Sequence, residues 1–135
     1  MRAIKLSAGQ LRPQVIDIEY SKDTWLKTMQ DACQTTCISI FTPARLIKET
    51  GQMYFLCCDE NALLMERPKE NLLASACSGR REALFGDVLI VKDGITDGEP
   101  DLVPVPEEEI DELLWLLHGY ADSLMLALKG IENDQ

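Results

Sequence analysis

A short, unbroken apolar run constrains the fold of this chain more than any other feature. Val88 to Val91 are all β-branched or aliphatic, and the run stands between Gly86-Asp87 and Asp93-Gly94. Four residues are too few for a helix, and apolar side chains at odd and even positions alike cover both faces of a strand. The run therefore predicts a strand in the middle of a sheet. Met53 to Cys58 is a second fully apolar run and is expected to be its neighbour.

Other segments have the composition of strands, and turn-forming residues flank them. They are Arg2 to Leu6, Gln14 to Tyr20, Cys37 to Phe41 with Leu46-Ile47 as its continuation, and Asp101 to Val105. The first two are expected to form a hairpin across Ser7 to Gln10. Two Asp-Gly pairs predict a loop at Asp93 to Pro100.

Two segments have apolar residues at helical spacing. The first begins after Ser21, whose hydroxyl can cap a helix, and runs to about Cys33. The second is longer and runs from Pro106 to Lys129. Its opening proline and glutamates, and the glycine after its end, are typical of helix termini. A shorter helix is expected near Glu70 to Cys77.

These elements predict an α+β fold in a single domain that spans residues 1–135. We expect an antiparallel or mixed sheet of about five strands, with the two main helices on one face. Residues 106–130 are expected to form an amphipathic, acidic C-terminal helix, whose apolar face covers the sheet or a partner.

The net charge of −10 is concentrated at the end of the chain. Residues 1–92 contain 12 basic and 11 acidic residues, whereas residues 93–135 contain one lysine and 12 acidic residues. Such a block is typical of a solvated helix face or of a binding surface. It argues against nucleic acid as a partner, because carboxylates repel phosphates over a Debye length.

The cysteines indicate a reducing environment. Their number is odd and their neighbours are apolar, so we expect reduced thiols in the core. They are Cys33, Cys37, Cys57, Cys58 and Cys77. Cys57 and Cys58 are adjacent and would point to opposite faces of a strand, so they do not fit a zinc site, and we expect neither metal nor cofactor. With no recognisable signal peptide and no run of roughly 20 apolar residues, a soluble, cytoplasmic protein without membrane contact is expected.

The polar face of the acidic helix carries two large apolar residues. On a helical wheel, Trp115 and Leu126 lie opposite the apolar face, with Gly119 between them. Acidic residues surround them, namely Glu108, Asp111, Glu112 and Asp122. A tryptophan is costly to leave in water, and a small residue beside it lets another helix approach closely. We interpret these residues as an interface for self-association or a protein partner; the alternative is a contact with residues 62–83 of the same chain.

A second candidate site is basic. Arg80 and Arg81 follow Ser78-Gly79, and two guanidinium groups on such a loop can bind the phosphate or carboxylate of an anionic small molecule. Three further basic residues would reinforce them, namely Arg67, Lys69 and Arg45. The alternative is an exposed loop whose arginines pair with the protein's own acidic helix.

No catalytic site is recognisable. His118 is the only histidine, and it has no identifiable catalytic partner. The chain contains no glycine-rich phosphate loop and no zinc-protease motif. We therefore expect a protein that is not an enzyme, and we assign no catalytic residues.

Three sequence features occur in the same order as in a known protein family. After the two opening strands come Phe55 to Asn61 and the proline-containing stretch Arg67 to Asn71, and then the glycine-containing strand Phe85 to Val91. Across roughly residues 1–115 the chain thereby resembles the bacterial and phage family named domain of unknown function 3846 (DUF3846). The resemblance implies a small protein of phages or mobile elements, with no established catalytic residues. The chain departs from the family pattern in its longer final helix.

The expected function is non-catalytic binding of a host or viral macromolecule by a small accessory protein, through the acidic helix and the patch around Trp115. One alternative is a protein that sequesters a phosphorylated or nucleotide signal with Arg80 and Arg81. Another is a nucleic-acid mimic, whose carboxylates imitate a row of phosphates and block a DNA-binding enzyme. Catalysis by carboxylates is a further alternative, but no recognisable base or orienting group supports it.

Overall fold

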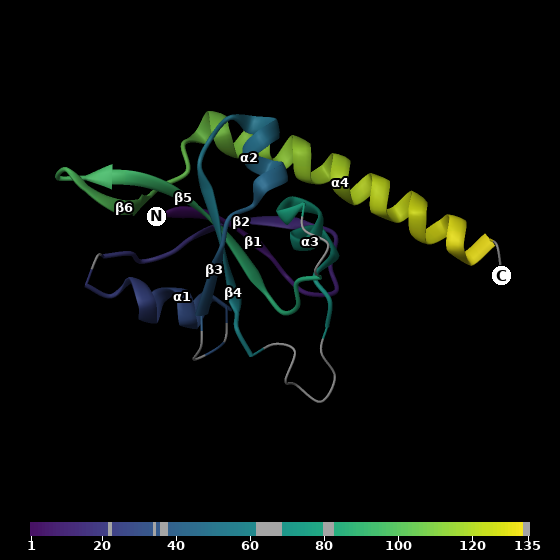
Figure 1. Ribbon diagram of the computed structural model, residues 1–135, viewed down its shortest axis with the longest axis horizontal. Helices are drawn as coiled ribbons and strands as arrows, with labels where there is room; N and C mark the ends of the chain where they lie inside the picture. Colours follow the sequence, from purple (N-terminus) through teal and green to yellow (C-terminus); the bar gives the residue numbers. More distant parts are fainter. Residues whose placement is uncertain (22, 34, 36–37, 62–68, 80–82, 134–135) are drawn as a thin grey trace.

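The apolar run Val88 to Val91 forms the first half of β5 (Val88–Thr96), which lies at the centre of the sheet (Figure 1). β1 (Arg2–Leu6) pairs with this half on one side and β4 (Tyr54–Asp59) on the other, both antiparallel. All four side chains of the run are fully buried. The predicted central strand and its predicted neighbour are therefore confirmed.

The structure, a computed structural model, describes residues 1–21, 23–33, 35, 38–61, 69–79 and 83–133. Within them, six strands form one antiparallel sheet in the order β2-β1-β5-β4-β3, and β6 pairs with the second half of β5. The remaining strands are β2 (Pro13–Asp17), β3 (Ile38–Phe41) and β6 (Glu99–Val103). This architecture confirms the α+β class and the single domain. Cys37, the predicted start of the third strand, lies outside the described residues.

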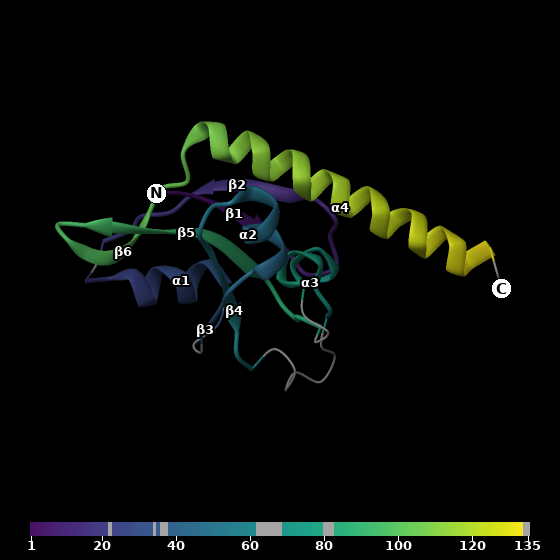
Figure 2. The same ribbon diagram turned by 45° about the horizontal axis from the view of Figure 1, so that its top comes forward.

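Helices cover both faces of the sheet. α1 (Trp25–Cys33) packs on one face, whereas α2 (Ala44–Thr50), α3 (Leu72–Ser78) and α4 (Glu107–Asn133) lie on the other. Figure 2 shows α4 above the strands and α1 below them. Among the residues described, no helix has both the length and the apolar content that a bilayer crossing needs.

The alternation of side chains along β5 explains this arrangement. Val88 and Ile90 belong to the larger core with α2, α3 and α4, while Leu89 and Val91 belong to the smaller core under α1. The structure thus corrects one detail of the predicted fold: the two main helices lie on opposite faces and not on one face. A strand that is apolar on both faces leaves one of them in water unless each face has its own cover.

The segment around Leu46 is a helix and not the predicted edge strand. α2 ends at Gly51, which adopts the left-handed conformation and donates its N–H to the carbonyl oxygen of Ile47 at 2.8 Å. Leu46 is fully buried in the larger core. Seven residues are too few to show a helical period, so the two adjacent apolar residues looked like a strand.

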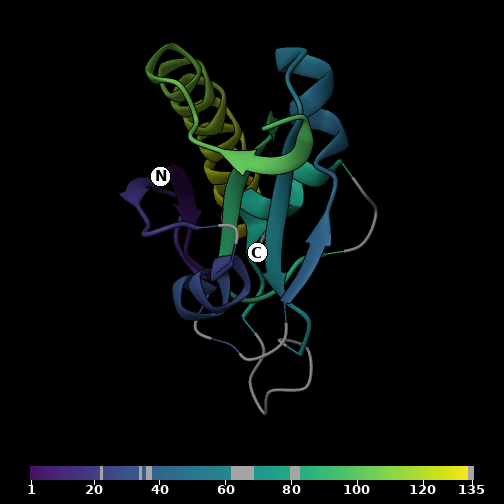
Figure 3. The same cartoon turned by 90° about the vertical axis from the view of Figure 1, so that its left-hand side faces the viewer.

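The predicted loop at Asp93 to Pro100 is a hairpin of β5 and β6, which is turned toward the reader in Figure 3. Only the second Asp-Gly pair forms the turn: Asp97 and Gly98 have φ angles of 53° and 80°, as a tight hairpin turn requires. Gly94 lies inside β5, where an added Cβ would come within 2.7 Å of Val103. The sequence pattern does not distinguish a glycine that turns the chain from one that lets two strands approach.

Asn71 joins three segments of backbone. Its buried side chain donates from Nδ2 to the carbonyl oxygens of Leu6 and Gly86, at 2.8 and 2.9 Å. Its Oδ1 accepts from the backbone N–H of Ala74 in the first turn of α3, at 3.1 Å. This one side chain therefore holds α3 against the end of β1 and the segment before β5.

Replacing Asn71 by alanine should destabilise the fold by about 3 kcal/mol, because two buried carbonyl groups and a helix N-terminus lose their partner. Urea unfolding followed by circular dichroism measures the change. The matched control is Asn61→Ala, which removes an exposed amide and should shift stability by no more than about 0.5 kcal/mol. Equal stabilities of the two variants would contradict the role assigned to Asn71.

Candidate functional site

α4 carries the predicted interface, and its first turn is fixed by its own backbone. The N–H groups of Glu109 and Ile110 donate to the carbonyl oxygen of Pro106, at 3.0 and 2.9 Å. Three glutamates occupy the first turn, where carboxylates interact favourably with the positive end of the helix dipole. The predicted helix start is thereby confirmed within one residue.

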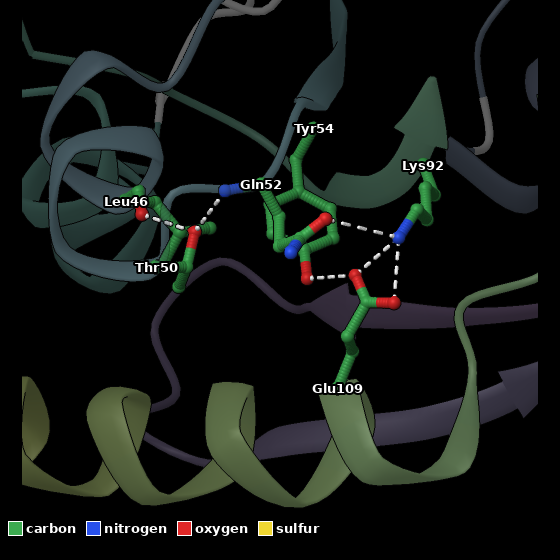
Figure 4. A network of polar contacts seen from close by, with 6 residues as sticks. All are labelled: Leu46, Thr50, Gln52, Tyr54, Lys92 and Glu109. Atoms are coloured by element: carbon green, nitrogen blue, oxygen red, sulfur yellow. Dashed lines mark hydrogen bonds and ion pairs between the residues drawn. The ribbon is translucent and has the colours of Figure 1, made fainter. Parts of the chain in front are cut away.

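A partly buried ion pair ties the start of α4 to the sheet (Figure 4). Lys92 of β5 pairs with the carboxylate of Glu109, and their side chains are only 17% and 13% exposed. The hydroxyl of Tyr54, on β4, donates to the same carboxylate at 2.8 Å. Lys92 also donates to Oε1 of Gln52 at 3.4 Å. The helix is therefore held by two neighbouring strands at once.

The loop that carries Gln52 is itself held in place, as Figure 4 also shows. The hydroxyl of Thr50 donates to the carbonyl oxygen of Leu46 at 2.8 Å and accepts from the backbone N–H of Gln52 at 3.1 Å. These bonds connect the last turn of α2 to the residue that contacts Lys92.

A second contact holds the middle of α4 against α2. The guanidinium of Arg45 lies 4.2 Å from the ring centroid of Tyr120, and its Nε donates to Glu49 at 3.3 Å. The hydroxyl of Tyr120 donates to the same carboxylate, and this bond is the largest of the effects that lower the pKa of Glu49. Arg45 therefore binds a carboxylate of its own domain.

Each of the three tyrosines donates its hydroxyl to a carboxylate. The pairs are Tyr20 with Asp101, Tyr54 with Glu109, and Tyr120 with Glu49. Burial is the main cause that raises the pKa of every tyrosine, and the carboxylate acceptor raises it further; the pKa of Tyr20 rises to about 12. The two partners of each pair lie 55 to 81 residues apart in the sequence, so no local sequence pattern predicts these pairs.

The predicted interface residues all lie on the solvent side of α4. Trp115 is 76% exposed and Leu126 is 70% exposed. An added Cβ on Gly119 would meet no atom within 4 Å. The acidic members of the set, Glu108, Glu112 and Asp122, are exposed as well. The described residues 69–79 therefore do not bury Trp115, which was the alternative interpretation; residues 62–68 and 80–82 lie outside the described part.

The last turns of α4 extend beyond the body of the domain (Figure 1). Among the α4 side chains that the structure describes, those of residues 107–130, Tyr120 and Ala121 are the last buried ones, and Leu124 is half-buried. Met125 and Leu128, which continue the stripe that faces the core, are exposed. The apolar face of the helix is thus longer than the core that covers it.

Two surface hollows border the exposed face of α4. One, of about 470 Å³, includes Trp115 and Gly119 in its lining. The other, of about 780 Å³, lies between Leu11 and Arg12 on one side and His118 and Met125 on the other. His118 is exposed, and no hydrogen bond or ion pair joins it to another described residue.

The predicted anion site falls largely outside the part of the chain that the structure describes. Arg80, Arg81 and Arg67 are not among the described residues. Lys69 is exposed, and its carbonyl oxygen accepts from the N–H of Gly86 at 2.9 Å. Arg45, the remaining predicted member, lies beside Gly79 and donates to Glu49.

The cysteines that the structure describes are core residues. Cys33, Cys57, Cys58 and Cys77 are buried and form no disulfide. Burial raises the pKa of the Cys33 thiol to about 11 and that of the others to about 12, which keeps them protonated and unreactive. Among the described residues, no group of three or more potential ligands is arranged to hold a metal ion.

The comparison with protein families gives one result. The model of the family described as domain of unknown function (DUF3846) matches residues 1–118, and the chain belongs to this family. The match covers the whole sheet and the first part of α4. No curated protein and no solved structure matches the chain.

The tyrosine pairs predict an unusual alkaline titration. Because each pKa is raised in the folded state, the stability that these pairs contribute is complete below about pH 10 and is lost as the pH rises through the folded-state values. Tyrosinate absorbance should stay absent at about pH 10 in buffer, whereas in concentrated urea it should be half developed there. Identical titrations in the two solvents would contradict the assignment.

The ion pair at the start of α4 predicts an asymmetric mutational effect. Lys92→Met should destabilise the protein by about 2 to 3 kcal/mol, because it leaves the carboxylate of Glu109 partly buried without its cation. The double variant Lys92→Met, Glu109→Leu should recover most of this loss. Lys48→Met is the matched control at an exposed position and should change little. Chemical unfolding measures all three; equal losses for Lys92→Met and Lys48→Met would exclude a role for the pair.

Proposed function

We propose that this DUF3846 protein is a non-catalytic binding protein that holds a protein partner through the exposed face of α4. The partner would be a host or viral protein, in the phage or mobile-element setting that the family resemblance implies. The four buried, reduced cysteines support a cytoplasmic location as part of the proposal. The sheet then serves as the scaffold that presents the helix.

The exposure of Trp115 carries this proposal. A tryptophan that is 76% exposed leaves a large apolar surface in water, and Leu126 repeats the situation on the same side of the helix. Eleven residues of helix separate them by about 16 Å, a span that one partner surface covers easily. Tryptophan is the residue type most enriched among the anchors that dominate binding energy at interfaces.

The uncovered end of α4 supports the same function. Met125 and Leu128 continue the apolar stripe past the core, so a partner that contacts the last turns would bury a second group of apolar side chains. An apolar stripe without cover on its own domain is costly in water and is stabilised when a partner removes it from solvent. Met125 is next to Leu126 in the chain, so the two exposed sets adjoin there.

The charge of the helix indicates the chemistry of the partner. Glu108, Glu112 and Asp122 surround the apolar residues and have no ion-pair partner among the described residues. A surface with basic side chains around an apolar pocket complements this arrangement. A second copy of the chain does so less well, because each copy carries a net charge of −10. We therefore favour a basic foreign partner over self-association.

The distribution of carboxylates also bears on nucleic-acid mimicry. The acidic residues of α4 gather in its first turns, and the helix then has no carboxylate between Glu112 and Asp122, a gap of about 15 Å. A row that imitates phosphates needs even spacing along its whole length, and this helix lacks it. A protein partner with an apolar anchor is favoured for this reason.

Substituting Trp115→Glu should abolish partner capture and leave the fold unchanged, because the side chain is an exposed anchor and not a core residue. Leu126→Glu should weaken capture as well. Pull-downs from host lysate with the tagged full-length chain compare the variants with the wild type, and sedimentation equilibrium reports any dimer. Raising the salt concentration should weaken capture through the acidic rim.

Ile95→Glu is the matched control, because Ile95 is 73% exposed but lies on the β5–β6 hairpin. It should retain every protein that the wild type captures, and all three variants should unfold within about 0.5 kcal/mol of the wild type. If Trp115→Glu retains the same proteins as the control, the proposal is wrong. A wild-type dimer that Trp115→Glu dissociates would replace the foreign partner by a second copy.

A further inference from the structure

The face of the sheet that carries α1 is only partly covered. α1 covers Cys57, Leu89 and Val91 with Met29 and Cys33. Beside this core, the same face has a hollow of about 380 Å³ over β3, β4, β5 and β6. This volume lies within the range of small-molecule sites in proteins, roughly 300 to 1,000 Å³.

The floor of the hollow is apolar. Ile40 of β3, Phe55 of β4 and Leu102 of β6 line it, one from each strand. Ile40 is exposed, while Phe55 and Leu102 are half-buried, so each has surface left to contact a ligand. A ligand with a hydrocarbon body would bury this surface.

Asp93 places a carboxylate at a position of β5 where the alternating pattern of the strand predicts an apolar residue. Leu89, Val91 and Asp93 are every second residue of β5, so their side chains share the face of the sheet that carries α1. Asp93 is directly opposite Leu102 in the antiparallel register. Its half-buried carboxylate has no hydrogen bond or ion pair with any other described residue. A negative charge in partly apolar surroundings is stabilised by a cation.

A second carboxylate and an aromatic ring complete the lining. The hydroxyl of Tyr20 donates to Oδ1 of Asp101, and the N–H of Leu102 donates to the same oxygen at 2.8 Å. Because burial and this bond raise the pKa of Tyr20 to about 12, the tyrosine is a neutral donor at physiological pH. Tyr20 and Phe55 both line the hollow, and aromatic rings attract cations. Among the residues that the structure describes, no basic side chain lines the hollow, and the two carboxylates would repel an anionic ligand.

We propose that this hollow binds a small organic cation with an apolar body, such as an alkylguanidinium or alkylammonium ion. The charged head lies between Asp93 and Asp101, and the hydrocarbon part lies on Ile40, Phe55 and Leu102. The site is on the α1 face of the sheet, opposite α4, so it does not depend on the function proposed for that helix.

Butylguanidinium is a suitable probe, and butylurea is its neutral control of nearly the same shape. Titration of the full-length protein, followed by backbone amide shifts in NMR spectra, should give saturable shifts at Phe55, Asp93 and Leu102. Butylurea should bind about tenfold more weakly, because it lacks the charge that the two carboxylates attract. Equal affinities for the two compounds, or no saturable shift with butylguanidinium, would overturn the proposal.

The variant Asp93→Asn keeps the shape of the side chain and removes its charge. It should weaken butylguanidinium binding about tenfold and leave butylurea binding unchanged. Asp111→Asn is the matched control, because it removes an exposed charge from α4 on the other face. Unchanged butylguanidinium affinity in a folded Asp93→Asn protein would refute the assignment.

A third titration separates a free cation from an arginine side chain of a partner protein. The probe is a capped Gly-Arg-Gly peptide, which presents the same guanidinium on a chain. Weaker binding of the peptide than of butylguanidinium supports a small-molecule site. Tighter binding of the peptide would show that the hollow accepts a protein side chain and would overturn the small-molecule assignment.

Discussion

The structure depends on one constraint: β5 is apolar on both faces and must be covered on both. Val88 and Ile90 require one layer of helices, and Leu89 and Val91 require another. This requirement places α1 on one side of the sheet and α2, α3 and α4 on the other. It also puts the exposed face of α4 and the hollow beside α1 on opposite sides of the molecule, where each can act without the other.

Buried apolar surface does not by itself fix the position of a helix, and polar contacts do this for α4. The Lys92–Glu109 pair holds its first turn against the sheet, and the contacts of Tyr120 with α2 hold its middle. Both contacts use a tyrosine that donates to a carboxylate, which satisfies the buried hydroxyl and orients the acceptor. The exposed side chains of α4 are therefore presented in a defined orientation.

The sequence predicted the parts of the fold that local patterns determine. The apolar run of β5, the start of α4 and the exposed side of Trp115 follow from periodicity and composition alone. The predicted end of α4 at Gly130 is wrong, because the helix continues to Asn133. The sequence did not predict which face of the sheet α1 covers. That face depends on the side of the sheet to which the chain crosses after β2, and no local pattern determines this. The contacts of Asn71 and of the tyrosines were also missed, because each joins residues that are far apart in the chain. The hollow was not predicted from the sequence for a similar reason, because residues of four separate strands line it.

The projecting end of α4 has a consequence for how such a protein can change over time. The family match ends at residue 118, and Ala121 is the last buried side chain of α4 among residues 107–130, whose side chains the structure describes. Leu124 still packs partly against the core, but residues 125–130 are exposed, so substitutions there alter the surface without disturbing the sheet or its packing. The exposed surface at the tip of the helix can therefore change while the rest of the molecule stays the same. The sheet and its packed helices form the constant part of the molecule, and the tip of α4 is the part that can vary.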